Sequence, residues 1–144
     1  MSVFRIFRIA GSGLTAERLR MDTIANNLAN ANTTRTEEGG PYRRQVPVFA
    51  PLLDRVMRRS GPQRAGYSGT GVQVVGVVSD PSPPRLVYDP QHPDANADGY
   101  VEMPNVNVVT EMVDLITATR AYEANIAALN AAKSMAQRAL EIGR

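Results

Sequence analysis

Few side chains in this chain of 144 residues have the types and spacing that catalysis requires. His92 is the single histidine, it lies in a predicted loop, and the chain contains no cysteine. A general base or a nucleophile needs a partner that activates or orients it, and neither a second histidine nor a thiol is present for that role. Glu111, Asp114 and Glu123 are predicted on the polar side of a helix, where solvation or pairing between subunits is expected. We therefore expect no catalytic residue and no enzymatic activity.

The segment 94–99 reads Asp-Ala-Asn-Ala-Asp-Gly and matches the first half of a calcium-binding loop. The match ends there, because the twelfth position is Asn105 where a bidentate glutamate is needed. Pro90 and Pro93 are also incompatible with a regular helix leading into such a loop. A plain Asp/Asn/Gly turn before a strand at Tyr100 is the preferred interpretation, so we expect no bound metal.

The formal net charge is +2, but it is unevenly divided along the chain. Residues 1–64 carry eleven arginines against five acidic residues, whereas residues 65–144 carry five basic against nine acidic residues. The arginines are scattered over a helix and a loop and are not clustered on one face with aromatic side chains beside them, so we expect no nucleic-acid partner. Gly69 and Gly71 do not complete a phosphate-binding glycine pattern, and we expect no cofactor.

The elements that position these residues begin with two helical patterns at the chain ends. The N-terminal pattern predicts a helix from Leu14 to about Ala31, after a break or frayed start at residues 11–13 that Ser12 caps. The C-terminal pattern predicts a helix from Glu111 to about Ile142. The N-terminal stripe is Phe7, Leu14, Met21 and Leu28, with Ala10, Ile24 and Ala31 beside it, and the C-terminal stripe is Met112, Leu115, Thr119, Tyr122, Ile126, Leu129, Lys133, Ala136 and Leu140.

Between the helices the periodicity changes from helical to extended. Strands are predicted at residues 44–50, 72–78, 85–88 and 100–103, separated by turns rich in proline and glycine. The fold class is therefore mainly α with a small β region, in which long terminal helices pair in a coiled-coil-like manner. We expect an N-terminal helical part at 1–35, a strand-rich central domain at 36–103 with a mobile loop at about 54–70, and a C-terminal helical part at 104–144.

The sharpest local motif is the asparagine-rich stretch at residues 24–33, Ile-Ala-Asn-Asn-Leu-Ala-Asn-Ala-Asn-Thr. Asparagine weakens a helix interior by about 0.5 kcal/mol relative to alanine, so several together suggest a compensating role. In one interpretation Asn26 and Asn30 form hydrogen bonds across a helix interface and fix its register. In the other, Asn32 and Thr33 simply end the helix. Both interpretations remain open at this point.

The same stretch, followed by Gly-Pro-Tyr-Arg-Arg-Gln at 40–45, resembles the N-terminal signature of bacterial flagellar axial proteins of the rod and hook. The C-terminal segments 99–115, 120–125 and 132–136 are similar to flagellar basal-body rod proteins. The resemblance covers nearly all of residues 3–50 and 70–142. It implies a structural subunit of the proximal rod that polymerises around a hollow export channel and transmits torque. The terminal helices would form the inner tube domain, with the central strands outside.

The resemblance also implies partners and a location. The partners would be copies of the chain, other rod proteins, the rod base adaptor and membrane ring, and the flagellar type III export apparatus. The rod spans the periplasm within the basal body, and export would proceed without a cleaved signal peptide. For the assembly interface we select residues from both helices, namely Leu14, Met21, Ile24, Asn26, Asn27, Leu28, Asn30, Met112, Leu115, Tyr122, Ile126 and Leu129.

Two other functions stay under consideration. Phe4, Ile6, Phe7 and Ile9 alternate with basic residues and would suit a module that lies on an anionic membrane surface. This segment lacks the uninterrupted apolar block of a secretory signal, and no transmembrane span is predicted. A second axial role, as a distal rod subunit, is the other alternative.

Overall fold

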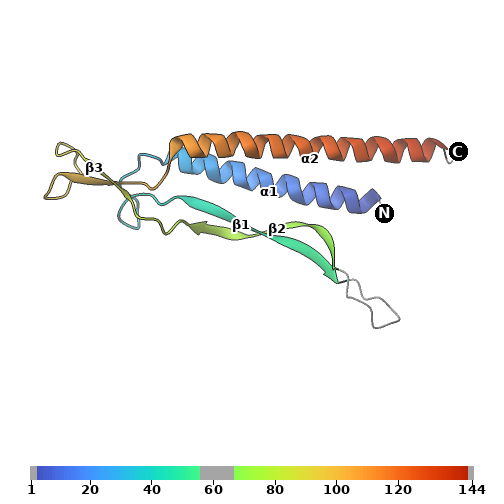
Figure 1. Cartoon of the computed structure of the whole chain (residues 1–144), viewed down its shortest axis with the longest axis horizontal. Coiled ribbons are helices and arrows are strands. Elements are labelled where there is room, and N and C mark those ends of the chain that lie inside the picture. Colours follow the sequence, from blue (N-terminus) through green and yellow to red (C-terminus); the bar gives the residue numbers. More distant parts are fainter. Residues whose placement is uncertain (1–2, 56–66, 143–144) are drawn as a thin grey trace. The chain divides into compact units, whose positions relative to one another are not determined.

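The computed structural model describes residues 3–55 and 67–142, which form two long helices and two small sheets (Figure 1). The predicted long terminal helices and the small strand region between them are confirmed. In chain order the elements are α1 (Val3–Ala29), β1 (Gln45–Arg55), β2 (Tyr67–Ser79), β3 (Arg85–Tyr88), β4 (Tyr100–Met103) and α2 (Val108–Ile142).

The helix α1 is continuous through residues 11–13, so the predicted break was wrong. The hydroxyl of Ser12, which we expected to cap a helix start, lies in the helix interior and donates to the carbonyl of Ile9 at 2.8 Å. It also accepts a hydrogen bond from the backbone N–H of Val72 in β2 at 3.1 Å. Ser12 therefore links α1 to β2, whereas Gly13 lies against α2, because a Cβ at Gly13 would be 3.1 Å from the Asn125 side chain.

The helix α2 begins three residues before the predicted start because Asn107 caps it. The Asn107 Oδ1 accepts the backbone N–H groups of Val109 at 3.0 Å and Thr110 at 3.2 Å, two of the donors that a helix start leaves unpaired. The helix continues to Ile142, the last described residue, which agrees with the predicted extent to about Ile142.

The buried side of α2 differs from the predicted stripe in one of its two rows. Leu115, Tyr122, Leu129 and Ala136 are half-buried as predicted, but the companion row is displaced by one residue. The small and polar side chains at 111, 118, 125 and 132 are covered, whereas the larger apolar ones beside them are not. Hydropathy alone favours the larger side chains, and close helix approach favours the smaller ones. The exposed members of the predicted stripe are Met112, Thr119, Ile126, Lys133 and Leu140.

The strands pair as two separate two-stranded sheets. β1 pairs with β2, and their arrows run in opposite directions in Figure 1. A loop was predicted at 54–70, but β1 reaches Arg55 and β2 begins at Tyr67, so both ends of that segment are strands. Residues 56–66 lie outside the described part. β3 pairs with β4 in antiparallel register from Arg85 opposite Met103 to Tyr88 opposite Tyr100. The turn predicted before Tyr100 is confirmed, because the Asn96 side chain accepts the backbone N–H groups of residues 98 and 100.

The chain divides into two compact units, and both helices contribute to each. Unit 1 comprises residues 1–18, 48–76 and 119–144, and unit 2 comprises residues 19–47 and 77–118. The buried apolar side chains are few and mostly small. Among the described residues they are Ala10, Ala16 and Ala132 in unit 1, and Ile24, Ala31, Val101, Val106 and Ala118 in unit 2.

Gly71 offers a test of the contact between α1 and β2 in unit 1. Its φ is +133°, and a Cβ there would overlap the Ser12 hydroxyl oxygen, so we expect Gly71→Ala to lower the free energy of unfolding by about 1–3 kcal/mol. Gly76→Ala in the same strand is the matched control, because a Cβ at Gly76 meets nothing within 4 Å. Urea unfolding of both variants measures the difference. Equal stability of the two variants would contradict the contact.

Candidate functional site

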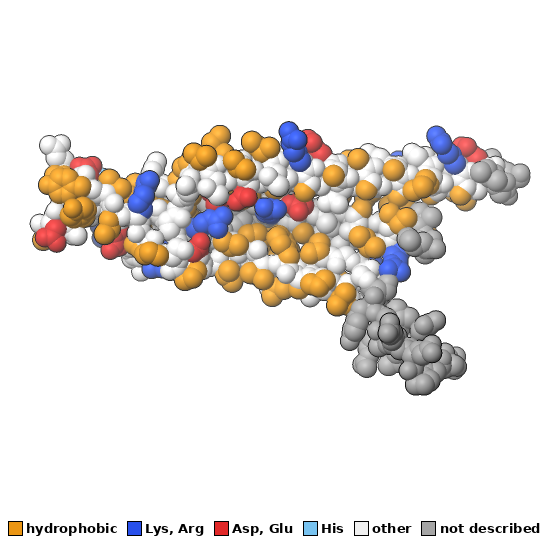
Figure 2. Space-filling model, in the orientation of Figure 1, with side chains coloured by type: hydrophobic (Ala, Val, Ile, Leu, Met, Phe, Trp, Pro, Cys, Tyr) orange, Lys and Arg blue, Asp and Glu red, His pale blue; other side chains and the backbone are white. Residues whose placement is uncertain are grey.

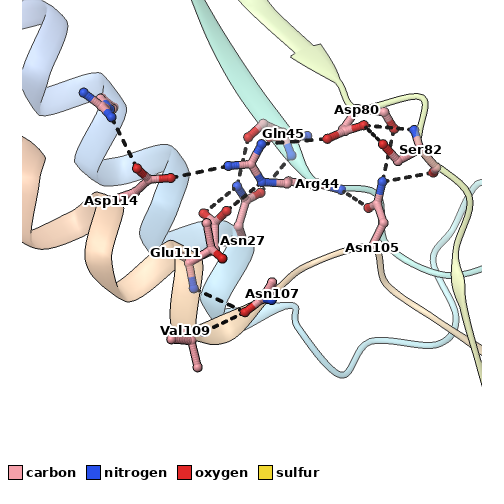
Figure 3. Close-up of polar contacts among 12 residues, drawn as sticks. Asn27, Arg44, Gln45, Asp80, Ser82, Asn105, Asn107, Val109, Glu111 and Asp114 are labelled. Carbon is pink, nitrogen blue, oxygen red and sulfur yellow. Dashed lines mark hydrogen bonds and ion pairs between the residues drawn. The ribbon is translucent and has the colours of Figure 1, made fainter.

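The most distinctive feature of unit 2 is a group of polar side chains that meet beside the start of α2 (Figure 3). They come from five separate parts of the chain: α1, the segment before β1, the segment after β2, the segment before α2, and α2 itself. We call them the polar cluster, and they are Asn27, Arg44, Asp80, Asn105, Glu111 and Asp114.

Asn27 lies at the centre of this cluster and is 1% exposed. Its Nδ2 donates to the backbone carbonyl of Gln45 at 2.9 Å and to Glu111 Oε2 at 3.1 Å. Its Oδ1 accepts the Tyr42 hydroxyl at 2.9 Å and the backbone N–H of Gln45 at 2.8 Å. Both donor hydrogens and both acceptor positions of the amide are therefore used, which is the condition for burying such a group without a large penalty.

Glu111 is completely buried, although it was predicted on the solvated side of α2. Its Oε1 accepts the Arg44 Nε–H at 2.6 Å, and its Oε2 accepts the amide of Asn27. A buried carboxylate is tolerated only when it is paired and hydrogen-bonded, and each oxygen here has its own donor. The position in the first turn of α2 adds a favourable interaction with the positive end of the helix dipole.

Arg44 connects the buried Glu111 to two aspartates that are partly exposed to solvent. Its guanidinium lies 3.8 Å from Asp80 Oδ2 and 3.7 Å from Asp114 Oδ2, and Arg20 lies 3.6 Å from the other oxygen of Asp114. These partners are about one-quarter to one-third exposed, so each ion pair is worth at most about 1 kcal/mol. Their contribution lies in orienting the guanidinium that the buried Glu111 requires.

The backbone around Arg44 is fixed by a second set of bonds. The Asn105 Oδ1 accepts the Arg44 backbone N–H at 2.8 Å, and the Asn105 Nδ2 donates to the carbonyls of Asp80 at 3.3 Å and Ser82 at 3.1 Å. The backbone N–H of Asp80 in turn donates to the Arg44 carbonyl at 2.7 Å. One asparagine thus holds the segments before β1 and after β2 against the segment that leads into α2.

Two groups in and beside the cluster have displaced pKa values. The pKa of Asp80 is lowered, first by hydrogen bonds from the Ser82 hydroxyl and backbone N–H, and then by the charge of Arg44. The pKa of Tyr42 is raised above 10.0, first because burial disfavours the phenolate and then because the charge of Glu111 repels it.

Asn26 and Asn30, which one of the two interpretations predicted to form hydrogen bonds across a helix interface, bond to each other at the end of α1. Asn30 Nδ2 donates at 3.0 Å to both the carbonyl and the side-chain oxygen of Asn26 on the same helix, and Thr33 Oγ1 donates to Asn30 Oδ1 at 3.2 Å. Within the chain these bonds close the end of α1. The amide that reaches across to α2 is Asn27, and its spacing from Ile24 and Ala31 places it on the buried face. That placement was the signal the sequence offered.

The remaining interface candidates fall into three groups by exposure. Ile24 and Asn27 are buried, whereas Asn26, Met112 and Ile126 are exposed. Their role in contacts between subunits remains a prediction. The half-buried candidates are Leu14, Met21, Leu28, Asn30, Leu115, Tyr122 and Leu129.

The cluster has the geometry of a structural joint. Among the described residues no group of three or more histidine, cysteine, aspartate or glutamate side chains is placed to hold a metal ion.

No described helix combines the length and the apolarity needed to cross a bilayer. Of the segment considered for a membrane surface, Phe4 and Ile9 are exposed, and Ile6 and Phe7 are half-buried.

Two family descriptions match the parts of the chain that form the two helices. Residues 7–35 match the model described as "Flagella basal body rod protein", and residues 97–142 match "Flagellar basal body rod FlgEFG protein C-terminal". The chain is thus of the flagellar basal-body rod class.

Full-length relatives identify the family more closely. The chain is 49% identical to the flagellar basal-body rod protein FlgC of Borreliella burgdorferi, over 99% of this chain and 98% of that protein. It is 45% identical to FlgC of Bacillus subtilis and 42% identical to FlgC of Salmonella typhimurium, each over the full length of both chains. The chain belongs to the FlgC family of flagellar basal-body rod proteins.

Replacing Asn27 tests the central role of this amide. We expect Asn27→Ala to lower the free energy of unfolding by about 3 kcal/mol, because it leaves several buried donors and acceptors without partners. The matched control is Asn26→Ala, one residue away and exposed; it loses only the exposed side-chain hydrogen bond from Asn30 and gains helix propensity, so a small net change is expected. Chemical denaturation compares the free energies of unfolding of the two variants, and equal losses of stability would contradict the central role of Asn27.

Tyr42 predicts a loss of stability in alkali. Because its folded pKa lies above the unfolded value of 10.0, folding favours the neutral phenol, and that contribution is complete below pH 10 and lost as the pH rises through the folded value. Tyr42→Phe removes this dependence. Thermal denaturation from pH 8 to 11.5 should therefore show a steeper alkaline decline for the native chain than for the variant, and parallel declines would argue against the shift.

Proposed function

We propose that this chain is a structural subunit of the proximal rod, which polymerises through its terminal helices around a hollow export channel and transmits torque. The names of its relatives support the rod assignment. The structural observation that carries the proposal is a stripe of large apolar side chains on the outer side of α2, directed away from α1. This outer stripe consists of Val109, Met112, Val113 and Ile116.

The outer stripe is unusually exposed for its composition. Its four side chains are 52% to 71% exposed and recur at the three- and four-residue spacing of one helix face. Figure 2 shows hydrophobic side chains at the surface along α2. Fully burying one such side chain contributes about 1.5–3 kcal/mol, so covering the stripe is a substantial driving force for association.

A groove beside the start of α2 extends this surface. It has a volume of about 500 Å³ and is lined by Pro104, Val108 and Val109, of which the last belongs to the outer stripe, and also by polar side chains such as Arg85 and Asn107. A partner helix that covers the stripe would therefore also have a recess to fill. Continuity between an apolar helix face and a groove favours a partner with an apolar helical face of its own, as in another rod subunit.

The second half of α2 supports the same proposal through its small side chains. Exposed alanines at 124, 127, 128, 131 and 139 permit a neighbouring helix to approach closely on more than one side. We propose that coiled-coil-like packing of the helical parts at 1–35 and 104–144 between neighbouring subunits builds the inner tube. The strand-rich part at 36–103 would lie outside it.

The proposal includes the wider assembly. The partners are copies of this chain, other rod proteins, the rod base adaptor and the membrane ring, and delivery is through the flagellar type III export apparatus without a cleaved signal peptide. The rod would cross the periplasm within the basal body. Family membership supports these assignments, and the exposed apolar surface supports the contacts with other subunits.

Complementation of a strain that lacks the gene tests the proposal. We expect the native chain to restore a rod above the membrane ring, as seen by electron cryotomography, and Val113→Asp/Ile116→Asp to fail, because two charges would have to be buried in the assembly. Thr117→Asp adds a charge to the same helix outside the outer stripe and should restore the rod. A complete rod with the double variant would refute the role of this surface, and a complete rod without the gene would refute the rod function.

A further inference from the structure

We propose that the polar cluster is a register lock: the bond between Asn27 and Glu111, completed by Arg44, selects one axial position of α1 against α2 in unit 2. The lock belongs to the fold of the chain itself and is independent of how copies assemble.

The apolar contact between these helices contains little register information. Among the described residues of α1 and α2 in unit 2, the buried apolar side chains are Ile24 and Ala118. Leu28 and Leu115 are only half-buried, so in a helix displaced by one turn of about 5.4 Å the apolar contact would lose part of their burial but would by itself leave no polar group without a partner.

The polar contact between Asn27 and Glu111 strongly favours one axial position of α1 against α2 over positions displaced by one turn. In the observed register each Glu111 oxygen has one donor, and the Asn27 amide makes four hydrogen bonds. Displacement by one turn would separate the two side chains while both remain within the seam. Each buried polar group left without a partner costs about 1–3 kcal/mol, and a charged one costs more, so displaced registers are excluded by their unsatisfied groups.

The lock also has the means to tie the helices to the rest of unit 2. Asn27 bonds both the N–H and the carbonyl of Gln45 at the start of β1, and the adjacent Arg44 holds Glu111 at the start of α2. A single asparagine that fixes helix register in an apolar seam is a known physical device. Here the asparagine is paired with a buried ion pair in place of a second asparagine.

The register is measured directly with two spin labels, since the natural chain has no cysteine to interfere. Labels at Ala29→Cys and Thr117→Cys occupy exposed positions in unit 2. Because Asn27 lies opposite Glu111, the two labels are offset along the helix axes, and sliding of one helix changes their separation. Double electron–electron resonance on the full-length chain should give one distance.

Asn27→Asp places a second carboxylate against Glu111 and removes the donor between them. We expect the folded variant to show a second distance, and the exchange variant Asn27→Asp/Glu111→Gln to return to one, because a glutamine amide donates to the new aspartate and still accepts from Arg44. The control Asn26→Asp makes the same chemical change on an exposed position and should keep one distance.

A purely structural cluster would give a different result. Asn27→Asp would then be less stable but would keep the native distance, and that outcome overturns the lock. If Asn27→Asp does not fold, the exchange variant decides: one native distance supports the lock, whereas two distances or an unfolded chain overturns it.

Discussion

A carboxylate that has no access to water must be matched on both oxygens, and in this chain Glu111 imposes that requirement. Asn27 in α1 donates a hydrogen bond to one oxygen of Glu111, and Arg44, in the segment before β1, donates to the other. Arg44 is held in turn by Asn105 through its backbone and by Asp80 and Asp114 through its side chain. The course of five chain segments therefore follows from the need to accommodate one buried charge.

The apolar residues have the opposite distribution. The fully buried apolar side chains of the two helices are mostly alanine, while exposed valine, isoleucine and methionine side chains lie on α2. A protein that functions alone gains more by placing its larger apolar side chains inside, because the gain scales with the area removed from water. A subunit of a polymer can leave them outside, since neighbours cover them on assembly. Membership of the FlgC rod family and this inverted distribution thus point in the same direction.

The side chains that fix geometry and the side chains that would drive association therefore lie on different surfaces. The polar cluster is buried within unit 2 and sets the relation of its segments, whereas the outer stripe provides area without fine geometric selection. If the register of α1 against α2 changed by one turn, the outer stripe would move along the helix axis relative to the rest of unit 2. The axial position of the outer stripe therefore depends on the hydrogen bonds of the buried cluster.

The sequence by itself determined the elements and the family. Helical periodicity at both ends, extended periodicity between them and the asparagine-rich signature were sufficient for these, because hydrophobic spacing and local turn chemistry are properties of neighbouring residues. The continuity of α1 through residues 11–13 was missed, because Ser12 contacts β2 and Gly13 lies against Asn125 of α2, and both of these partners are distant in the chain.

What only the tertiary structure decided is which members of each pattern meet. Hydropathy placed Met112 and Ile126 on the inner row and Glu111 in solvent, but the folded chain reverses both assignments. Close approach of two helices selects small side chains, and a charge becomes tolerable inside only when its partners arrive from distant segments. Arg44 lies 67 residues before Glu111 in the chain, so no local pattern reveals that they form a pair.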